Sequence, residues 1–259
     1  MSSNLIERTE HGPVHELRLN RPPANALNRA LIEALLGEVR SAPQRGAKAL
    51  VISGRAGMFS GGLDVPELLG QPRAEMHALW KSFFALMEAI ATSPAPVAAA
   101  ITGHAPAGGC VIALFCDQRI MSEGRYRIGL NEVQVGLRMP RPILTAAQHV
   151  VGRRQAARMA TTAELFTVEE ALRIGLIDDA VAIDQVVPSA IAWGEKIAAL
   201  PPIAMSKTRA LARNEFQSTF RGLDEEQLEL FLDEWFGDET QGAMGALVKA
   251  LEERRKAKG

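Results

Sequence analysis

Two kinds of group in this sequence have the chemistry and the spacing to act together. One is a backbone loop, Ala107-Gly108-Gly109, which leads into a short apolar helix predicted to begin near Gly108. The first N–H groups of a helix have no partner within it, so they bind negative oxygen, and small residues let a ligand approach them. The other is a carboxylate, Glu132, which follows Gly129. We therefore predict a pocket that stabilises an oxyanion, with one carboxylate base beside it.

A second stretch rich in glycine, residues 53–64, offers backbone rather than side chains. It follows a predicted buried strand and contains Gly54, Gly57, Gly61 and Gly62. These glycines permit turns with positive φ and close approach of a ligand, although such loops also carry glycine for purely structural reasons. The stretch lacks the Lys-Ser/Thr ending of a P-loop and the G-x-G-x-x-G spacing of a dinucleotide fold. Nucleotide hydrolysis and hydride transfer therefore lose support.

Other candidate residues carry less chemistry. Asn131, beside Glu132, either orients the carboxylate or caps a turn, and the sequence leaves both alternatives open. His104 and His149 have no paired nucleophile at a recognisable spacing, which disfavours a hydrolytic triad and favours structural roles. The two cysteines both lie in the apolar helix and exclude a disulfide framework. No metal site is expected, because no ligands have suitable spacing.

Composition limits the classes of partner. The 259 residues are 47% apolar and 23% charged, with a formal net charge of −1, so the chain can bury a substantial core and needs no nucleic acid. Residues 89–116 are uncharged apart from a histidine that can be protonated. Prolines and glycines divide this run into pieces too short to cross a bilayer, so no membrane is expected. The first ten residues lack a basic segment followed by an apolar one, and secretion is not expected.

Hydrophobic periodicity and turn residues predict how the candidate groups are positioned. A hairpin of residues 5–8 and 14–19 opens the chain, Asn28 caps a helix, and a proline ends the helix at 73–92. Further strands are predicted at 49–52, 97–101, 118–121 and 176–181. Further helices are predicted at 140–151, 153–160, 168–174, 185–200, 203–216, 223–236 and 240–255. The chain thus divides into an α/β part, residues 1–195, and a helical part, residues 196–259.

Three segments together resemble the enoyl-CoA hydratase/isomerase, or crotonase, superfamily. They are FSGGLD (59–64), APAGGC (105–110) and IGLNEVQVG (128–136), and RPPANALN (21–28) extends the likeness toward the start of the chain. Within the superfamily, the chain looks most like the mitochondrial type of Δ3,Δ2-enoyl-CoA isomerase. The resemblance implies an α/β fold, a crotonase-like spiral of ββα turns in residues 1–195. It also implies a helical trimerisation region in residues 196–259.

The resemblance also assigns roles to site residues. The backbone N–H groups of Leu63 and Gly108 would hold the oxygen of an acyl-CoA thioester, and Glu132 would be the catalytic base. Hydratases of the family carry two glutamates, and the first of these positions is Val111 here, which puts water addition in doubt. Members that use a second acid in the region of residues 133–152 are poorer matches, because this segment holds none. Residues expected to contact the substrate or its CoA moiety are Ala24, Ala26, Ser60, Gly61, Gly62, Asp64, Gly109 and Asn131.

The function implied is isomerisation of 3-enoyl-CoA to trans-2-enoyl-CoA in fatty acid β-oxidation, by a 1,3-proton shift on one glutamate. It needs no metal or redox cofactor, since coenzyme A is part of the substrate. Two alternatives stay open. One is another enolate-forming reaction of the family on a different acyl-CoA, including hydration of 2-enoyl-CoA, and the other is a non-catalytic member that binds CoA or RNA.

The assembly implied is a homotrimer or a dimer of trimers. Amphipathic helices in the last part of the chain are expected to need a partner surface for Leu228, Phe231, Leu232, Trp235 and Phe236. The compartment expected is the cytoplasm of a bacterium or the mitochondrial matrix of a eukaryote.

Overall fold

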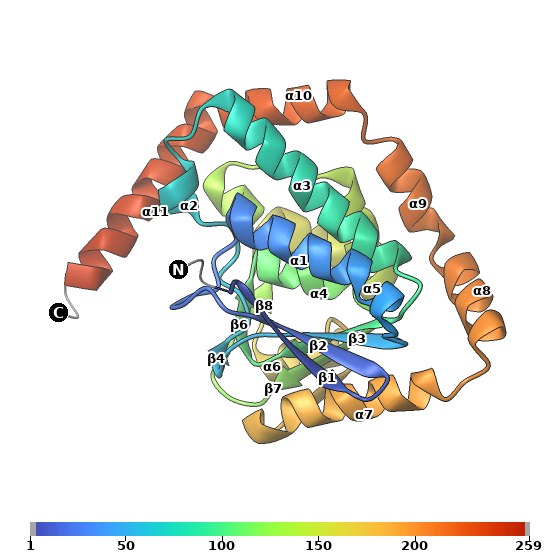
Figure 1. Cartoon of the computed structure of the whole chain (residues 1–259). Coiled ribbons are helices and arrows are strands. Elements are labelled where there is room, and N and C mark those ends of the chain that lie inside the picture. The colour runs from blue at the N-terminus through green and yellow to red at the C-terminus, as the bar shows by residue number, and fades with distance from the viewer. Residues whose placement is uncertain (1–3, 257–259) are drawn as a thin grey trace.

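A computed structural model describes residues 4–256 and contains two sheets that wind through one spiral (Figure 1). The larger sheet has the strand order β1-β2-β3-β5-β7-β9, in which β1 and β2 form an antiparallel hairpin and all other neighbours are parallel. Its strands are β1 (Ile6–His11), β2 (Val14–Leu19), β3 (Ala49–Ser53), β5 (Val97–Ile101), β7 (Gln118–Ser122) and β9 (Asp179–Val181). The smaller sheet is parallel and consists of β4 (Gly57–Met58), β6 (Gly103–Pro106) and β8 (Ile128–Gly129).

Each turn of the spiral runs from a strand of the larger sheet to a strand of the smaller sheet and then to a helix. After β3 and β4 come α2 (Val65–Leu68) and α3 (Arg73–Thr92). After β5 and β6 comes α4 (Gly108–Phe115), and after β7 and β8 comes α5 (Arg141–Thr162). Parallel neighbours require crossovers of this kind. The predicted spiral of ββα turns is confirmed.

Both faces of the larger sheet are covered by helices, which explains why its central strands are apolar throughout. In β5, Val97, Ala99 and Ile101 face the main core, whereas Ala98 and Ala100 face α7 (Val186–Ala198). Helices α1 (Arg29–Ser41), α3, α4 and α5 lie over the opposite face from α7 (Figure 1). The boundary expected at residue 195 falls inside α7, so the helix that seals the sheet spans it.

Local sequence signals fix several helix ends. The Asn28 side chain accepts a hydrogen bond from Leu31 N at 3.0 Å and caps α1, as predicted. The two segments predicted at 140–151 and 153–160 are continuous in α5. They are separated by a kink at Gly152, whose φ of +77° is not helical. The segment predicted as one helix at 203–216 is instead α8 (Pro202–Ala212) and α9 (Asn214–Arg221), separated at Arg213. The last strand is shorter than predicted.

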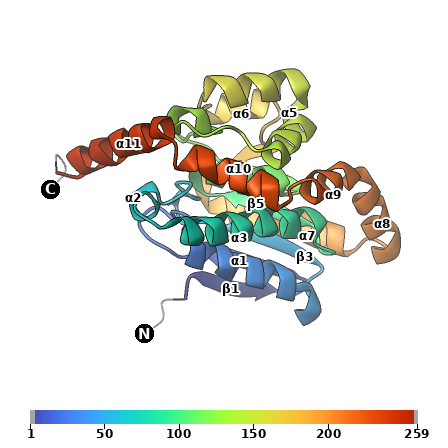
Figure 2. The same ribbon diagram turned by 90° about the horizontal axis from the view of Figure 1, so that it is seen from above.

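The last two helices are α10 (Glu225–Trp235) and α11 (Asp238–Lys256). Helix α10 lies alongside α3, and α11 extends from it toward the C-terminus (Figure 2). The Trp80 ring centroid of α3 lies 4.6 Å from that of Phe231 and 5.8 Å from that of Trp235. The expectation that the α10 apolar residues need a partner chain is wrong, because Leu228, Phe231, Leu232 and Trp235 are buried within this chain and Phe236 packs against the same core.

The two most exposed large apolar side chains of the described residues, Ile203 and Leu211, belong instead to α8. Leu200, Ile203 and Leu211 are 46%, 71% and 78% exposed, and no α8 residue is buried. Among the described residues, no helix combines the length and the hydropathy needed to span a bilayer. No secretion signal was expected in the first ten residues, and residues 1–3 of that segment lie outside the described part of the chain.

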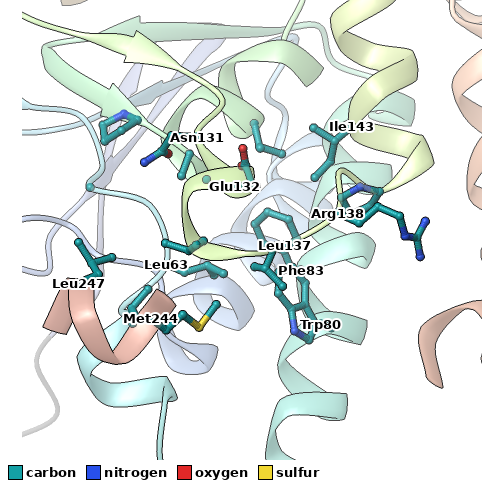
Figure 3. A pocket seen from close by; sticks show the side chains of 18 of the residues that line it. Leu63, Trp80, Phe83, Asn131, Glu132, Leu137, Arg138, Ile143, Met244 and Leu247 are labelled. Atoms are coloured by element: carbon teal, nitrogen blue, oxygen red, sulfur yellow. The ribbon is translucent and has the colours of Figure 1, made fainter. Parts of the chain in front are cut away.

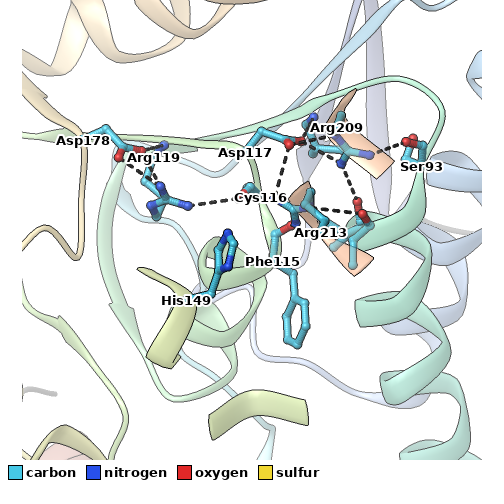
Figure 4. Close-up of polar contacts among 12 residues, drawn as sticks. Ser93, Phe115, Cys116, Asp117, Arg119, His149, Asp178, Arg209 and Arg213 are labelled. Atoms are coloured by element: carbon cyan, nitrogen blue, oxygen red, sulfur yellow. Dashed lines mark hydrogen bonds and ion pairs between the residues drawn. The ribbon is translucent and has the colours of Figure 1, made fainter. Parts of the chain in front are cut away.

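A buried network of ion pairs fastens α8 and α9 to the spiral (Figure 4). Arg209 donates to the two carboxylate oxygens of Asp117 at 2.7 and 2.8 Å, and Arg213 donates to the same carboxylate at 3.2 Å. Asp117 also accepts the Val97 N–H of β5 at 2.8 Å. Arg213 donates to the main-chain oxygen of Phe115, at the C-terminal end of α4. Helix α4 is therefore held at its far end by the C-terminal helices.

Candidate active site

Two backbone loops meet at the N-terminus of α4. Leu27 donates to the Gly62 oxygen at 2.7 Å and accepts from Asp64 N at 3.0 Å, which fixes Leu63 on both sides. Gly108 is the first residue of α4. In the described chain, neither the Leu63 N–H nor the Gly108 N–H has an acceptor, and both residues line one cavity. The predicted pair of oxyanion donors is thus brought to the same cavity.

The contact between the loops depends on residues without side chains. A Cβ atom on Gly109 would lie 2.6 Å from the Ser60 oxygen, and one on Gly62 would lie 2.9 Å from the Ala107 Cβ. Ala107 itself has a φ of +46°, a strained conformation that turns the chain sharply into α4. The buried Ser60 hydroxyl donates to the Asn25 oxygen at 2.8 Å and accepts from Gly62 N at 3.3 Å. Ser60, Gly62 and Gly109 shape the loops and are not among the cavity-lining residues.

Glu132 begins a short 3-10 helix, Glu132–Val135, and its side chain reaches the same cavity (Figure 3). Its Oε2 atom is buried without a hydrogen-bond partner, and so is Oδ1 of Asn131. Burial raises the pKa of Glu132 to about 7, although hydrogen bonds from the backbone N–H groups of Glu132 and Asn131 act in the opposite direction. A carboxyl with this pKa can both accept and release a proton near neutral pH.

The cavity has a volume of about 220 Å³ and apolar walls. Among the described lining residues, Glu132 is the single carboxylate, and the only other charged group is Arg138. Val111, on α4, lines the cavity and is 1% exposed. Gly61 and Asn131 line it as predicted. The arrangement offers one base and two backbone donors in a space with mostly apolar walls, which suits chemistry that passes through an enolate.

Three predicted contact residues lie beside the loops and do not line the cavity. The Ala24 oxygen accepts from Gly61 N at 2.8 Å, and the Ala26 oxygen accepts from Arg21 at 2.9 Å. Asp64 caps α2 and pairs with Arg21 at 2.6 Å. These contacts hold the residues that flank the Gly61–Leu63 loop on the side away from the cavity. Direct contact of Ala24, Ala26 and Asp64 with a substrate stays a prediction.

Much of the cavity wall comes from residues that sequence reasoning did not assign to the site. Trp80 and Phe83 come from α3, and Met244 and Leu247 come from α11 (Figure 3). Phe231 comes from α10. Their helical periodicity marks a buried face, but it does not separate a cavity wall from a filled core. No signal in the sequence could have identified them, because both environments select the same apolar side chains.

The structure also brings together His77, Glu225 and Glu229, whose ligand-type atoms lie within 4.8 Å of one another. These residues come from α3 and α10, so their sequence spacing does not indicate a metal site. Arg73 pairs with Glu229 at 2.5 Å, and Lys81 lies 4.0 Å from Glu225. The group therefore serves as an ion-pair bridge between two helices on the surface.

Comparison with known proteins finds similar proteins over nearly the whole chain. The model of the enoyl-CoA hydratase/isomerase family matches residues 9–257. The human mitochondrial protein enoyl-CoA delta isomerase 1 is 30% identical over 257 residues, which cover 97% of this chain and 84% of that protein. The crystal structure of human mitochondrial Δ3-Δ2-enoyl-CoA isomerase matches with a TM-score of 0.92 at 28% identity, covering 96% of this chain and 99% of that chain.

An enoyl-CoA hydratase from Mycobacterium ulcerans matches with a TM-score of 0.81 at 26% identity, covering 89% of this chain and 99% of that chain. The similar proteins thus include both isomerases and hydratases. They share the crotonase fold, which this chain adopts. Because the family model spans almost the whole sequence and two backbone donors meet a buried glutamate, this chain belongs to the enoyl-CoA hydratase/isomerase family.

Proposed function

We propose that this protein isomerises 3-enoyl-CoA to trans-2-enoyl-CoA, as a step in the breakdown of unsaturated fatty acids. The observation that carries the proposal is the single carboxylate, Glu132, among the described residues of a cavity that also holds two unpaired backbone N–H groups. A 1,3-proton shift needs one base, whereas hydration is best served by two. The likeness to the human isomerase supports the same choice.

The residues perform this reaction in two proton transfers. Glu132 removes a proton from C2 of the substrate, and the negative charge that develops spreads onto the thioester oxygen. The Leu63 and Gly108 N–H groups donate to that oxygen, and each donor in a dry site lowers the barrier by about 2.7–4 kcal/mol. The protonated Glu132 then returns the proton at C4, which moves the double bond into conjugation. A pKa of about 7 suits both steps, because the carboxyl gains and loses the proton at little cost.

Hydration is the competing reaction within the family. It requires a group that holds and activates water against the double bond, and the position where the hydratases carry their first glutamate is Val111 here. Val111 is buried and apolar. The likeness to hydratases keeps this alternative as the outcome that an assay must exclude.

Further properties follow from the same proposal. The reaction uses no metal or redox cofactor, and coenzyme A enters and leaves as part of the substrate. The partner is an acyl-CoA thioester rather than a nucleic acid or a membrane. We propose a homotrimer or a dimer of trimers, located in the bacterial cytoplasm or, in a eukaryote, in the mitochondrial matrix.

The test is a panel of 3-enoyl-CoA substrates, with conversion to the 2-enoyl isomers followed by chromatography. We expect turnover by the wild type, and a loss of about 10²–10⁴ in rate for Glu132→Gln, because Gln cannot accept the C2 proton. Binding of a saturated acyl-CoA should persist in this variant. Glu123→Gln, which alters an exposed carboxylate, is the matched control and should keep full activity. Full activity in Glu132→Gln would remove Glu132 as the base.

A further inference from the structure

A second cavity, here called the polar chamber, adjoins the active-site cavity and has a volume of about 270 Å³. Arg138, Pro140 and Phe231 line both cavities, so the same three residues form the wall between them. The rest of the polar chamber is lined largely by polar and charged side chains. Arg141 begins α5, Thr219 belongs to α9, Asp224 precedes α10, and Gln227 lies in the first turn of α10.

The two arginines of the chamber keep donors free. Arg138 donates through Nε to Glu234, at 2.8 and 3.1 Å, and its Nη1 and Nη2 atoms make no hydrogen bond within the described chain. Its guanidinium points away from Glu132 (Figure 3). Arg141 has neither an ion pair nor a side-chain hydrogen bond to any described residue, and it is exposed. Unpaired guanidinium donors beside a cavity favour a carboxylate, which matches their planar fork.

The acidic groups nearby leave donors free on both arginines and pair with only one of them, Arg138. Asp224 lines the chamber, but its Oδ1 atom accepts from Gln227 N at 3.0 Å and caps α10. Glu234 binds only Nε of Arg138 and does not line the chamber. Arg138 is thus ion-paired through Nε and keeps its Nη donors free, whereas Arg141 has no carboxylate partner among the described residues.

The position of the chamber identifies which part of a ligand would reach it. Glu132 and the backbone donors act at the thioester end of the acyl chain, and the apolar walls formed by Phe83, Ile143 and Phe231 receive its hydrocarbon. An acyl chain that extended past Pro140 and Phe231 would end beside the guanidinium of Arg138, which lines both cavities. A methyl terminus there would meet charged groups, whereas a carboxylate would pair with them.

We infer that the polar chamber binds a carboxylate at the distal end of the acyl chain, so that the substrates include thioesters of dicarboxylic acids. The inference rests on the proposed function for the placement of the thioester. A cavity of about 220 Å³ admits more than one chain length, so chains of about six to twelve carbons are compared.

The test measures binding first, with saturated thioesters that cannot be isomerised. Calorimetry compares CoA esters of dicarboxylic acids with methyl-ended esters of equal carbon number, for the wild type, Arg138→Gln, Arg141→Gln and the control Arg40→Gln. Arg40 is an exposed arginine of α1 outside both cavities. At one chain length or more, the wild type and the control should prefer the dicarboxylic ester by about threefold to fivefold, the value of a good ion pair on exposed groups.

Arg138→Gln and Arg141→Gln should reduce this preference, and a double variant should abolish it. The inference is overturned if no chain length shows a preference, or if both variants weaken the two kinds of ester equally. Turnover of methyl-ended and dicarboxylic 3-enoyl-CoAs forms a separate arm. If binding shows the preference and no 3-enoyl-CoA is isomerised, the proposed function is wrong, but the inference that the polar chamber binds a carboxylate is retained. If methyl-ended substrates are isomerised without a preference in binding, only the chamber fails.

Discussion

The backbone of Gly62 lies against the backbone of Gly108. A Cβ atom on Gly62 would stand 3.3 Å from Gly108 N, and one on Gly108 would stand 3.4 Å from the Gly62 Cα. Gly62 also has a φ of +83°, which side chains rarely adopt. Leu63 and Gly108 supply the proposed oxyanion donors, so the geometry of the reaction depends on a contact that no side chain can enter.

Gly62→Ala should therefore separate the two donors. Its Cβ would meet that of Ala107 at 2.9 Å, and the loops must move apart to accept it. We expect a loss of about 10²–10³ in kcat, the effect of losing one oxyanion donor. Circular dichroism checks that the variant is folded. Gly37→Ala is the matched control, because nothing lies within 4 Å of its Cβ and α1 gains helix propensity there. A folded Gly62→Ala enzyme with the wild-type rate would refute the assigned hole.

The pH dependence of activity should follow Glu132. Burial raises its pKa from 4.5 to about 7, and only the ionised form accepts the C2 proton. We expect kcat/KM to fall tenfold per pH unit below about pH 7 and to level off above it. A profile that stays flat down to pH 5 would contradict a buried glutamate base.

The same pKa shift links stability to pH. Between pH 4.5 and about 7 the native state holds a proton on Glu132 that the unfolded chain has released. The free energy of unfolding should therefore decrease as the pH rises through this window. Glu132→Gln removes the linkage and should be the more stable protein above pH 7. Urea unfolding of both proteins across the window measures the difference, and identical pH profiles would count against the shift.

Val111→Glu should introduce hydration. The new carboxylate would stand on the cavity wall with Glu132, at the position where hydratases of the family carry their first glutamate. Burial without a partner destabilises the protein by several kcal/mol unless the group takes up a proton. Loss of 2-enoyl-CoA absorbance together with formation of 3-hydroxyacyl-CoA gives the readout. Val111→Gln is the control of similar size and should show none. Strong hydration by the wild type would sink the isomerase proposal.

Asp117→Ala should be among the most damaging substitutions away from the cavity. It leaves Arg209 and Arg213, whose side chains are 11% and 9% exposed, without their shared carboxylate. Breaking a buried pair of this kind costs about 3–5 kcal/mol of unfolding free energy. Glu164→Ala removes the exposed pair with Arg158 and should cost about 1 kcal/mol or less. Equal costs for the two substitutions would mean that the network does not anchor the helices.

The exposed face of α8 should lie in the interface of the proposed homotrimer. Ile203 and Leu211 project apolar side chains that the chain itself does not cover. Light scattering should show a trimer or a hexamer for the wild type, and a shift toward the monomer for the double change to aspartate. A wild-type monomer at micromolar concentration would contradict the assembly.

The local elements and the identity of the chemical groups could be predicted from the sequence alone. Asn28 caps α1, β5 is apolar at every residue because both of its faces are covered, and α3 spans residues 73–92 as its periodicity predicts. These features depend on neighbours in the chain, through helix caps, turn residues and the period of the apolar pattern. The glycine-rich loops and Glu132 could be recognised for the same reason, since their residue types are visible without the fold.

The way in which distant segments close the site could not be predicted from local patterns and is visible in the fold. Phe231 was expected to contact a partner chain. It lies instead in the cavity wall beside Trp80, because α10 packs on α3. The helix predicted at 203–216 breaks at Arg213, whose side chain pairs with Asp117, a residue far away in the sequence. The pKa of Glu132 depends on atoms that surround it in space. Contacts of this kind join residues far apart in the chain, so no local pattern encodes them.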